Sequence, residues 1–384
     1  MRICYVNDGT SIYDHLFLKY LLDKGHEVHL ITFCPSHRSH GAEDSFPIPT
    51  FKGLNVHHFD VQKILGADSW GFFKFGLNSM VYVSVLSKLV RRIKPDVLNG
   101  HFIPTYGLWS ALSFYHPFLL TVWGSDILVL PKQLRTGRPI TRFVLKRADA
   151  VIVDSVVQKE AAINFGCDPQ KIVSFPWAVN LGRFNPKVSG ERIRKSLGWE
   201  ENQIVFCMRW HKPIYGVKYL LYAVPEIIKE HPDARFMIGG CGPQTDEFKG
   251  FVAKKGLEKY VKFVGKVPHE EMPEYMAACD IYVSPSFSDG TSASLLEAMA
   301  CSKPVVVSDI PGNLEWIMNG KNGFTVPTAE VKALTDSILA LLQDEGLREE
   351  FGAKNWEIVR QRADLRRGLQ LYEDTLIALA SRRK

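Results

Sequence analysis

The sequence predicts an α/β protein with two doubly wound parallel sheets, and three observations support this prediction. Short apolar runs alternate with longer helical patterns along most of the 384 residues, which is typical of parallel βαβ units. The apolar runs are nearly continuous, as expected for strands that are covered on both faces. The alternation stops once, at the polar, Pro- and Gly-containing stretch 185–191, and this indicates a boundary between two domains.

The same patterns assign the elements in chain order. The expected strands form two series, one before and one after the boundary: 2–6, 27–32, 97–98, 118–122, 150–153 and 171–175, then 203–207, 235–238, 261–264, 281–283 and 304–307. Helical spacing of apolar residues predicts helices that include 16–24, 79–93, 218–230, 271–278 and 294–300. We therefore place an N-terminal domain at 1–187 and a C-terminal domain at 188–356, and expect a terminal helix at about 357–384 to pack back onto the first domain.

Composition agrees with two globular domains. Apolar residues make up 46% of the chain and charged residues 23%, which excludes disordered, collagen-like and coiled-coil proteins. The seven cysteines form no C-x-x-C pair, so we expect reduced, buried thiols rather than disulfides or a zinc site. The apolar run 3–6 is too short for a signal peptide and polar residues interrupt the window 111–130, so a cytoplasmic protein is expected.

Positive charge is concentrated in one part of the chain. Residues 61–147 hold twelve Lys or Arg against three acids, an excess of nine, while the whole chain carries +6. Such a region favours phosphate, an anionic polymer or an anionic membrane surface, and ordinary solvated side chains are the alternative. The aromatic and basic stretch 70–75 precedes a basic helix and suits a lipid-linked or polymeric acceptor at a membrane, with core packing as its alternative.

The most informative window is 281–300, where a strand runs through a small polar loop into a helix that begins near Ser292. Backbone amides at Gly290, Thr291, Ser292 and Ala293 would be unpaired donors at the positive end of that helix, an arrangement that binds anions. Two acids, one in the loop and one on the helix, could then hold sugar or ribose hydroxyls. The alternative is that Ser292 only caps the helix and that the acids are surface residues.

Several motifs in order resemble family four of the retaining glycosyltransferases. In the first half these are K-P-D-V (94–97), G-H-F (100–102), T-V-W-G-S-D (121–126) and V-S-F-P-W-A-V-N-L-G-R-F (173–184). In the second half they are Arg209, G-G-C-G-P (239–243), V-G-K-V (264–267), an acid eight residues before the Glu of L-E-A-M-A (296–300), P-V-V-V-S (304–308) and G-N-L-E (312–315). The resemblance implies the GT-B fold, in which two Rossmann-like domains face each other across a donor cleft.

The resemblance also implies roles for individual residues. Arg209 is expected to bind the donor diphosphate with a fixed positive charge. Glu297 is expected to hold the nucleotide ribose, and Asp289 the hydroxyls of the donor sugar. His101 is expected to lie beside the donor sugar and the scissile bond, where it would orient the substrate rather than act as a nucleophile.

Further positions follow from the same motifs. We expect the donor site to include Lys212, Gly240, Val267, Gly290, Thr291, Ser292 and Ala293, with the base contacted largely through backbone near Val267. We expect the acceptor side to include Gly9, Thr10, His15 and Asp126. No metal site and no cofactor other than the nucleotide sugar is expected, because cations and the helix N-terminus would neutralise the diphosphate.

Several positions depart from the family pattern, and two of them affect the donor site. Position 289 is Asp where the family usually has Glu, which shortens its reach by roughly 1.5 Å. Tyr215 stands just before Gly216, where the family usually has Lys, and Lys212 is the candidate replacement.

We therefore expect a retaining, metal-independent glycosyltransferase of polysaccharide or glycolipid synthesis, with a UDP-sugar favoured over GDP-mannose and with no nucleic-acid partner. A sugar-nucleotide epimerase of the same fold and a non-catalytic sugar-nucleotide-binding subunit are the alternatives. The absence of G-x-G-x-x-G and of a P-loop motif argues against dehydrogenases and P-loop kinases.

Overall fold

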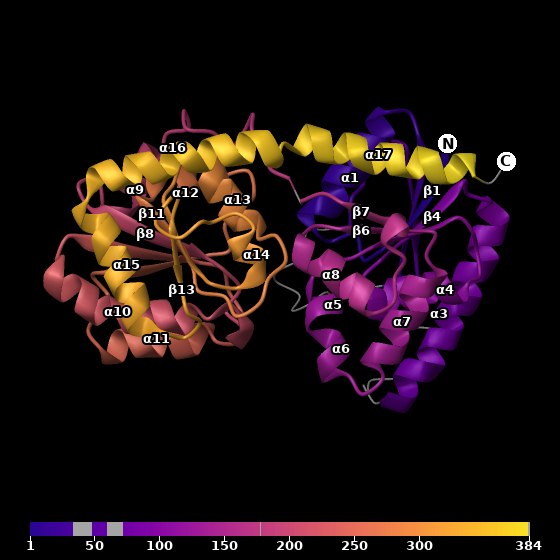
Figure 1. Ribbon diagram of the computed structural model, residues 1–384, viewed down its shortest axis with the longest axis horizontal. Helices are drawn as coiled ribbons and strands as arrows, with labels where there is room; N and C mark the ends of the chain where they lie inside the picture. Colours follow the sequence, from indigo (N-terminus) through magenta and orange to yellow (C-terminus); the bar gives the residue numbers. More distant parts are fainter. Residues whose placement is uncertain (34–47, 60–71, 177, 383–384) are drawn as a thin grey trace. The chain divides into compact units, whose positions relative to one another are not determined.

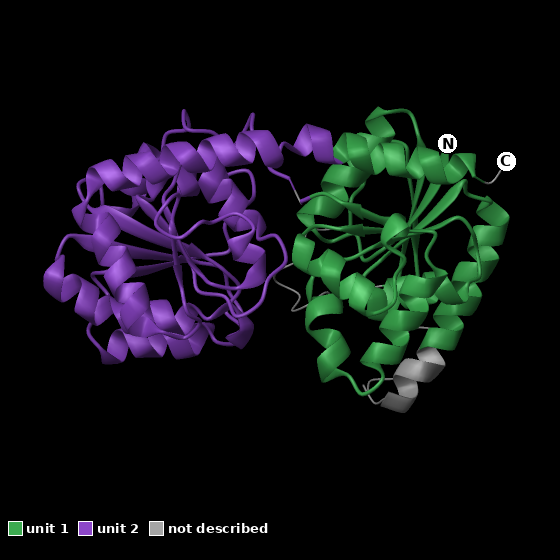
Figure 2. Ribbon diagram, in the orientation of Figure 1, with its two compact units in different colours: residues 1–175, 369–384 green, residues 176–368 purple. Residues whose placement is uncertain are grey.

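Two separate parallel sheets organise the chain. The computed structural model describes residues 1–33, 48–59, 72–176 and 178–382, without the side chains of 72–78. Contacts divide the chain into unit 1, residues 1–175 with 369–384, and unit 2, residues 176–368 (Figure 2). The prediction of an α/β protein with two doubly wound parallel sheets is confirmed.

Unit 1 contains a seven-stranded sheet in the order β3-β2-β1-β4-β5-β6-β7, and all its strand pairs are parallel. Its strands are β1 (Arg2–Val6), β2 (Glu27–Thr32), β3 (Leu54–His58), β4 (Val97–His101), β5 (Phe118–Thr121), β6 (Ala150–Val153) and β7 (Ile172–Ser174). The order reverses between β1 and β4, and ligands of such sheets bind beyond the carboxyl ends of the strands at that point.

Helices cover both faces of this sheet (Figure 1). On one face, Cys4 and Val6 of β1 pack into a cluster with side chains of α3 and α7, and on the other face Tyr5 bonds to α1. The helices are α1 (Ile12–Asp23), α3 (Phe72–Ile93), η1 (Ile103–Gly107), α4 (Leu108–Leu112), α5 (Ser125–Leu128), α6 (Leu130–Gln133), α7 (Gly137–Arg147), α8 (Val156–Asn164) and η2 (Pro169–Lys171). The stretch 70–75, which we interpret as an acceptor contact, lies outside the side chains that the structure describes.

The terminal helix α17 (Leu365–Ser381) packs on unit 1 beside α1. The rings of Tyr372 and Phe17 lie 4.7 Å apart, and the Glu373 carboxylate accepts a hydrogen bond of 2.9 Å from the Tyr20 hydroxyl. The units divide at 175/176 and 368/369, whereas the sequence places the divisions at 187/188 and 356/357. The segment that follows β7 belongs with unit 2 because Val179 exchanges backbone hydrogen bonds of 2.9 and 3.0 Å with Ala363 and Leu365.

Unit 2 contains a six-stranded parallel sheet in the order β10-β9-β8-β11-β12-β13, which reverses between β8 and β11. Its strands are β8 (Gln203–Met208), β9 (Ala234–Gly239), β10 (Val261–Gly265), β11 (Ile281–Ser284), β12 (Val305–Ser308) and β13 (Phe324–Val326). Alternate residues of β8 enter different clusters, Phe206 on the face of α9, α12, α13 and α16, and Val205 on the face of α10, α11 and α15. These helices are α9 (Glu191–Leu197), α10 (Val217–Glu230), α11 (Thr245–Lys254), α12 (Met272–Ala278), α13 (Ala293–Ala300), α15 (Val331–Gln343) and α16 (Glu345–Arg362), with the short η3 (Pro213–Tyr215) and α14 (Pro311–Leu314) between them.

Every strand predicted from the sequence is present, and β3 and β13 are additional. Among the described residues, no helix combines the length and the apolar character that crossing a membrane requires.

Candidate functional site

Arg209 is the centre of a polar cluster at the switch point of unit 2. It directly follows β8, and its guanidinium reaches the end of the neighbouring strand β11. Its Nε and Nη2 donate hydrogen bonds of 2.8 and 2.6 Å to the Ser284 hydroxyl, and Nη2 also donates one of 2.6 Å to the Ser292 hydroxyl. These bonds hold the guanidinium in one orientation at the N-terminus of α13.

Asp289 completes this cluster. Its Oδ2 lies 2.9 Å from Nη2 of Arg209, and the two side chains are only 22% and 9% exposed. Burial raises the pKa of the Asp289 carboxyl, and the Arg209 charge opposes that rise. Burial acts to lower the pKa of Arg209, but the Asp289 charge raises it above its usual range. Each charge therefore favours the ionised form of the other against the effect of burial.

A side-chain cap and a close backbone contact hold the loop before α13 at the helix start. Ser292 is the N-cap, and its hydroxyl accepts a hydrogen bond of 3.4 Å from the Leu295 amide. Thr291 is buried, Ala293 is the first helical residue, and Gly290 packs so closely on Gly312 that a Cβ at position 312 would lie 2.1 Å from the Gly290 carbonyl oxygen. The helix N-terminus and Arg209 thus supply positive potential at one place.

Glu297 lies one turn into α13, with its carboxylate facing His269. Glu297 Oε1 and His269 Nε2 are 3.5 Å apart, and both side chains are mostly buried, at 12% and 15% exposed. The structure therefore places the two acids that the sequence singled out, Asp289 and Glu297, on the same loop–helix segment with different partners.

The segment after Arg209 has Tyr215 just before Gly216, where the family usually has a lysine. The Tyr215 ring centroid lies 5.7 Å from the Arg209 guanidinium carbon, so an aromatic ring packs where the family usually has a cation. The Lys212 ammonium lies 4.8 Å from the Trp210 ring centroid. Lys212 is thus directed at Trp210, because the cation is attracted to the ring face.

Gly240 directly follows β9, and Val267 lies two residues beyond the end of β10. Gly240 has φ +97°, and a Cβ there would lie 2.1 Å from the Arg209 carbonyl oxygen, so glycine is required for the two strand ends to approach. The Val267 side chain is buried in the cluster beneath α13. Its backbone is therefore the part that can contact a ligand.

In unit 1, His101 ends β4 at the switch point and is fully buried. Its ring lies 4.1 Å from the Tyr5 ring, its Nδ1 accepts a hydrogen bond of 3.2 Å from Trp123 Nε1, and its Nε2 lies 2.9 Å from the Asn99 side-chain amide. An indole N–H can only donate, so Nδ1 of His101 accepts from Trp123. Burial lowers the pKa of His101 well below its usual range, which keeps the ring neutral.

Asp126 supports the loops around His101 from inside. Its carboxylate accepts hydrogen bonds of 3.0 Å from the Ile103 and Trp123 amides. Phe102, between His101 and Ile103, has φ 58°, a left-handed conformation that side chains disfavour. Burial raises the pKa of Asp126 to about 6. Asp126, which we expect on the acceptor side, thus holds the ends of β4 and β5 together with its carboxylate enclosed.

The remaining acceptor-side candidates follow β1. Gly9 has φ +75°, and the Thr10 amide and hydroxyl each lie 3.0 Å from Asp8 Oδ1, which closes a tight turn before α1. The His15 ring, on the first turn of α1, lies 5.8 Å from the Phe51 ring. These residues share the carboxyl edge of the sheet with His101 because β1 and β4 are parallel neighbours.

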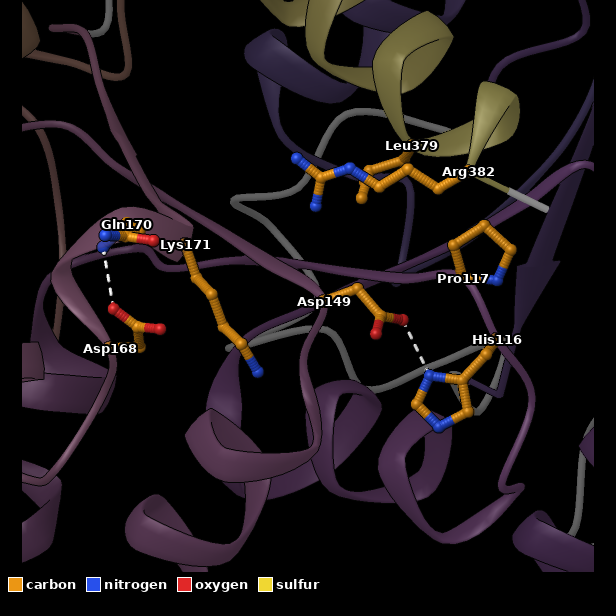
Figure 3. A pocket seen from close by; sticks show the side chains of 8 residues that line it. All are labelled: His116, Pro117, Asp149, Asp168, Gln170, Lys171, Leu379 and Arg382. Atoms are coloured by element: carbon orange, nitrogen blue, oxygen red, sulfur yellow. Dashed lines mark hydrogen bonds and ion pairs between the residues drawn. The ribbon is translucent and has the colours of Figure 1, made fainter.

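A separate hollow of about 420 Å³ lies at the opposite, amino edge of the same sheet (Figure 3). His116 and Asp149, which precede β5 and β6, form a pair of 2.6 Å in it, and the Lys171 ammonium donates a hydrogen bond of 2.9 Å to the Ala148 carbonyl. The charged groups of this hollow thus connect residues at the starts of β5, β6 and β7, away from the switch point.

Sequence reasoning missed the neighbours that orient the site, namely Ser284, His269, Asn99 and Trp123. Ser284 could have been found because it ends the strand next to β8. The partners of His101 and Glu297 come from other elements, and no local pattern identifies them.

Comparison with known proteins finds related sequences along most of the chain. Residues 189–357 match the model of group 1 glycosyl transferases, and residues 2–155 match the model described as glycosyl transferase 4-like. An N-acetyl-alpha-D-glucosaminyl L-malate synthase of Bacillus anthracis is 23% identical over 379 residues, 96% of this chain and 94% of that protein. A GDP-mannose-dependent phosphatidylinositol monomannoside mannosyltransferase of Mycolicibacterium smegmatis is 29% identical over 235 residues, and the match spans 57% of this chain and 61% of that relative.

Solved structures agree on the fold. Anabaena HepE in complex with UDP superimposes with a TM-score of 0.76 at 21% identity over 99% of this chain and 100% of its own. Sucrose-phosphate synthase of Thermosynechococcus elongatus superimposes with a TM-score of 0.80 at 19% identity, over 98% of this chain and 100% of its own. The fold, together with the family matches and the relatives, identifies a GT-B glycosyltransferase that uses nucleotide sugars. The chain belongs to the family-four-like glycosyltransferases, as the resemblance predicts.

Proposed function

We propose that this enzyme transfers a sugar from a UDP-sugar to an acceptor hydroxyl with retention of anomeric configuration and without a metal. The observation that carries the proposal is the position of Arg209. Its guanidinium is fixed by Ser284, Ser292 and Asp289 at the N-terminus of α13, where a diphosphate would meet both charge and backbone amides. As the sugar leaves, the diphosphate becomes more anionic, and a preoriented cation stabilises that charge.

The same arrangement supports metal independence. Arg209 and the amides at the start of α13 supply the positive potential that a divalent ion supplies elsewhere. We expect UDP to bind equally well with and without EDTA in calorimetric titrations. A loss of binding in EDTA that Mg²⁺ or Mn²⁺ restores would contradict the proposal.

Retention is supported by the Asp289-to-Glu297 spacing, which resembles that of the retaining family. The expected product has the anomeric configuration of the donor, formed by attack of the acceptor hydroxyl on the face that the leaving group vacates. Proton NMR of the product's anomeric coupling tests this directly. An inverted product would overturn the assignment.

The donor base is proposed from fold-wide similarity. HepE, which superimposes over nearly the whole chain, was solved with UDP and with UDP-glucose. A GDP-mannose donor is the second candidate, because the 29% identical mycobacterial relative is named for it. Titration of UDP, GDP and their glucose, N-acetylglucosamine and mannose conjugates distinguishes the two donors. Stabilisation of the protein by uridine nucleotides alone supports a UDP-sugar, and stabilisation by guanosine nucleotides alone supports GDP-mannose.

The acceptor is proposed to be a lipid-linked or polysaccharide hydroxyl reached at an anionic membrane surface. On α7, three exposed cations recur every fourth residue, Arg138, Arg142 and Lys146, and so form a stripe along one helix face. Exposed Lys132 and Arg135 extend it, and no acid occurs between Asp126 and Asp149. Among the described residues, these five cations form no ion pair, so their charge is available to phosphate headgroups.

Vesicle binding tests this surface. Replacing Arg138, Arg142 and Lys146 by Gln should weaken co-sedimentation with phosphatidylglycerol vesicles about a hundredfold, at about 1 kcal/mol for each lost charge. The matched control replaces three exposed lysines of unit 2, Lys254, Lys255 and Lys259, and removes the same net charge. Equal losses in both triple variants, or none in the stripe variant, would refute a specific surface.

Two rivals make different predictions. An epimerase would convert the sugar nucleotide without an acceptor, and a binding subunit would hold the donor without ever releasing free nucleotide. Acceptor-dependent release of UDP is the result expected here.

A further inference from the structure

Three residues from separate elements of unit 2 form a chain of contacts that ends at Glu297, the acid that we assign to the donor ribose. Arg183 lies in the segment before α9, His269 in the loop after β10, and Glu297 on α13. His269 stands two residues beyond Val267, where the base is expected, so the three lie along the nucleoside part of the proposed donor site. Arg183 and His269 have no role in the function proposed above.

Arg183 fixes the tautomer and the orientation of His269. Its Nη1 lies 3.1 Å from His269 Nδ1, and its Nη2 donates a hydrogen bond of 2.9 Å to the His269 carbonyl oxygen. A guanidinium has donors only, so Nδ1 accepts and the neutral imidazole carries its proton on Nε2. Arg183 thus contacts both the ring and the backbone of His269.

The protonated nitrogen faces Glu297. Nε2 lies 3.5 Å from Glu297 Oε1, within the range of a charge–dipole contact, and the two side chains are mostly withdrawn from water. In such surroundings an N–H dipole restrains a carboxylate more strongly than it does in solvent. The contact lies on one carboxylate oxygen and so favours one orientation of the carboxylate toward a ribose diol.

We propose that His269, held by Arg183, is a positioning residue for Glu297 and thereby sets the preference of the enzyme for ribonucleotide over deoxyribonucleotide donors. The inference rests on the proposed function, in which Glu297 binds the ribose. A carboxylate that accepts hydrogen bonds from two vicinal hydroxyls must keep its O–C–O plane aligned with the diol. A freely rotating carboxylate would discriminate less between ribose and deoxyribose.

A purely structural role for His269 is the competing explanation, because its ring also lies 5.7 Å from the buried Phe184 ring. Two substitutions separate the roles. His269→Phe keeps an aromatic ring beside Phe184 but removes both nitrogens. His269→Gln gives up the ring but places an amide N–H near the position of Nε2, so it should rescue positioning and not packing.

The experiment measures dissociation constants of UDP and 2′-deoxy-UDP by calorimetry, with GDP and 2′-deoxy-GDP in parallel. The intact protein should bind the ribonucleotide about tenfold or more tightly than the deoxyribonucleotide, as expected for a lost hydrogen bond to a charged group. H269F should lower that ratio about three- to tenfold, H269Q should keep most of it, and E297A should abolish it. Thermal unfolding establishes that each variant is folded.

Kinetics supply the second readout. H269F should raise the KM for the donor and leave kcat within about twofold, because ribose binding is shared by ground and transition states. The effect of H269F should disappear in the E297A background, since the two act through one contact.

The outcomes distinguish the two levels of the argument. If no nucleotide binds the intact protein, the proposed function fails. If UDP or GDP binds and E297A abolishes ribose preference but H269F does not, the positioning role alone is overturned. If E297A leaves the preference unchanged, the ribose assignment of Glu297 is wrong, and the positioning role is wrong with it.

Discussion

The Arg209 guanidinium and the Asp289 carboxylate form an ion pair of 2.9 Å that links the end of β8 to the loop after β11. The pair spans the point where the strand order of unit 2 reverses. Burying two charges is costly unless both remain paired and hydrogen-bonded. Ser284 and Ser292 accept hydrogen bonds from Nε and Nη2 of Arg209, so the cluster holds a cation in place before any nucleotide sugar arrives.

Removal of one partner of this pair should therefore affect stability as well as turnover. Arg209→Ala leaves Asp289 buried without its counter-charge, and we expect unfolding to become about 3 kcal/mol easier. Chemical denaturation measures this, and turnover should fall at the same time at least a hundredfold. Arg209→Ala with unaltered transfer rates would refute the role that we assign.

The enclosed carboxylate of Asp126 should give the protein a specific pH dependence. Its pKa is raised from 3.8 to about 6 by burial, so the folded state binds a proton more tightly than the unfolded state does. The resulting stabilisation is complete below about pH 4 and is lost as the pH rises to about 6, and linkage gives roughly 3 kcal/mol.

The measurement is the free energy of unfolding between pH 4 and 7 for the wild type and for Asp126→Asn. Because Asn does not titrate in this range, the difference between the two proteins should change by about that amount across the window. Parallel curves would show that Asp126 titrates normally. Asp14, whose pKa burial also raises to about 6, contributes in the same direction to both proteins.

Gly240 should tolerate no side chain. An alanine Cβ would lie 2.1 Å from the Arg209 carbonyl oxygen at a φ of +97°, so Gly240→Ala should cost about 2–4 kcal/mol of stability through strain and backbone displacement. Gly250, inside α11, has open space around its Cβ position, and Gly250→Ala should instead stabilise by about 0.5–1 kcal/mol. Thermal denaturation of both variants checks the contrast. Equal effects would show that the strand ends do not require glycine.

His101 should remain neutral over the whole physiological pH range. Burial lowers its pKa well below the usual value, and Trp123 donates to Nδ1. Nitrogen-15 NMR of histidine-labelled protein should show a neutral ring whose resonances do not change from pH 8 to pH 5. A resonance that titrates near pH 6.5 would mean that the ring is open to solvent, and the buried network would then be incorrect.

The sequence predicts the strands well where they are central and apolar. The run Ile-Tyr-Val of β11 and the run Val-Val-Val of β12 are buried on both faces, so hydrophobicity alone identifies them. The edge strand β3, with the sequence Leu-Asn-Val-His-His and largely exposed, carries no such signal. Its existence depends on pairing with β2, which is a tertiary property.

The candidate site shows the same division. Arg209, Asp289 and Glu297 could be found because they lie at fixed places in recognisable motifs. The direction of Lys212 toward Trp210, the enclosure of Asp126 and the contact of His269 with Glu297 could not. The first depends on a local side-chain conformation that no pattern specifies, and the other two depend on residues that the fold brings together from separate parts of the chain.

The most direct test of the central claim is the dissociation constant of UDP in the presence of EDTA for the wild type, Arg209→Ala and Arg235→Ala. Arg235 lies on β9 and donates to the Pro232 carbonyl, so it is a matched arginine outside the cluster. We predict metal-independent binding by the wild type and by the Arg235 variant, and about hundredfold weaker binding by the Arg209 variant, as expected for loss of a charged group on a diphosphate. Equal affinity in all three proteins, with GDP as well as with UDP, would contradict a donor site built around Arg209.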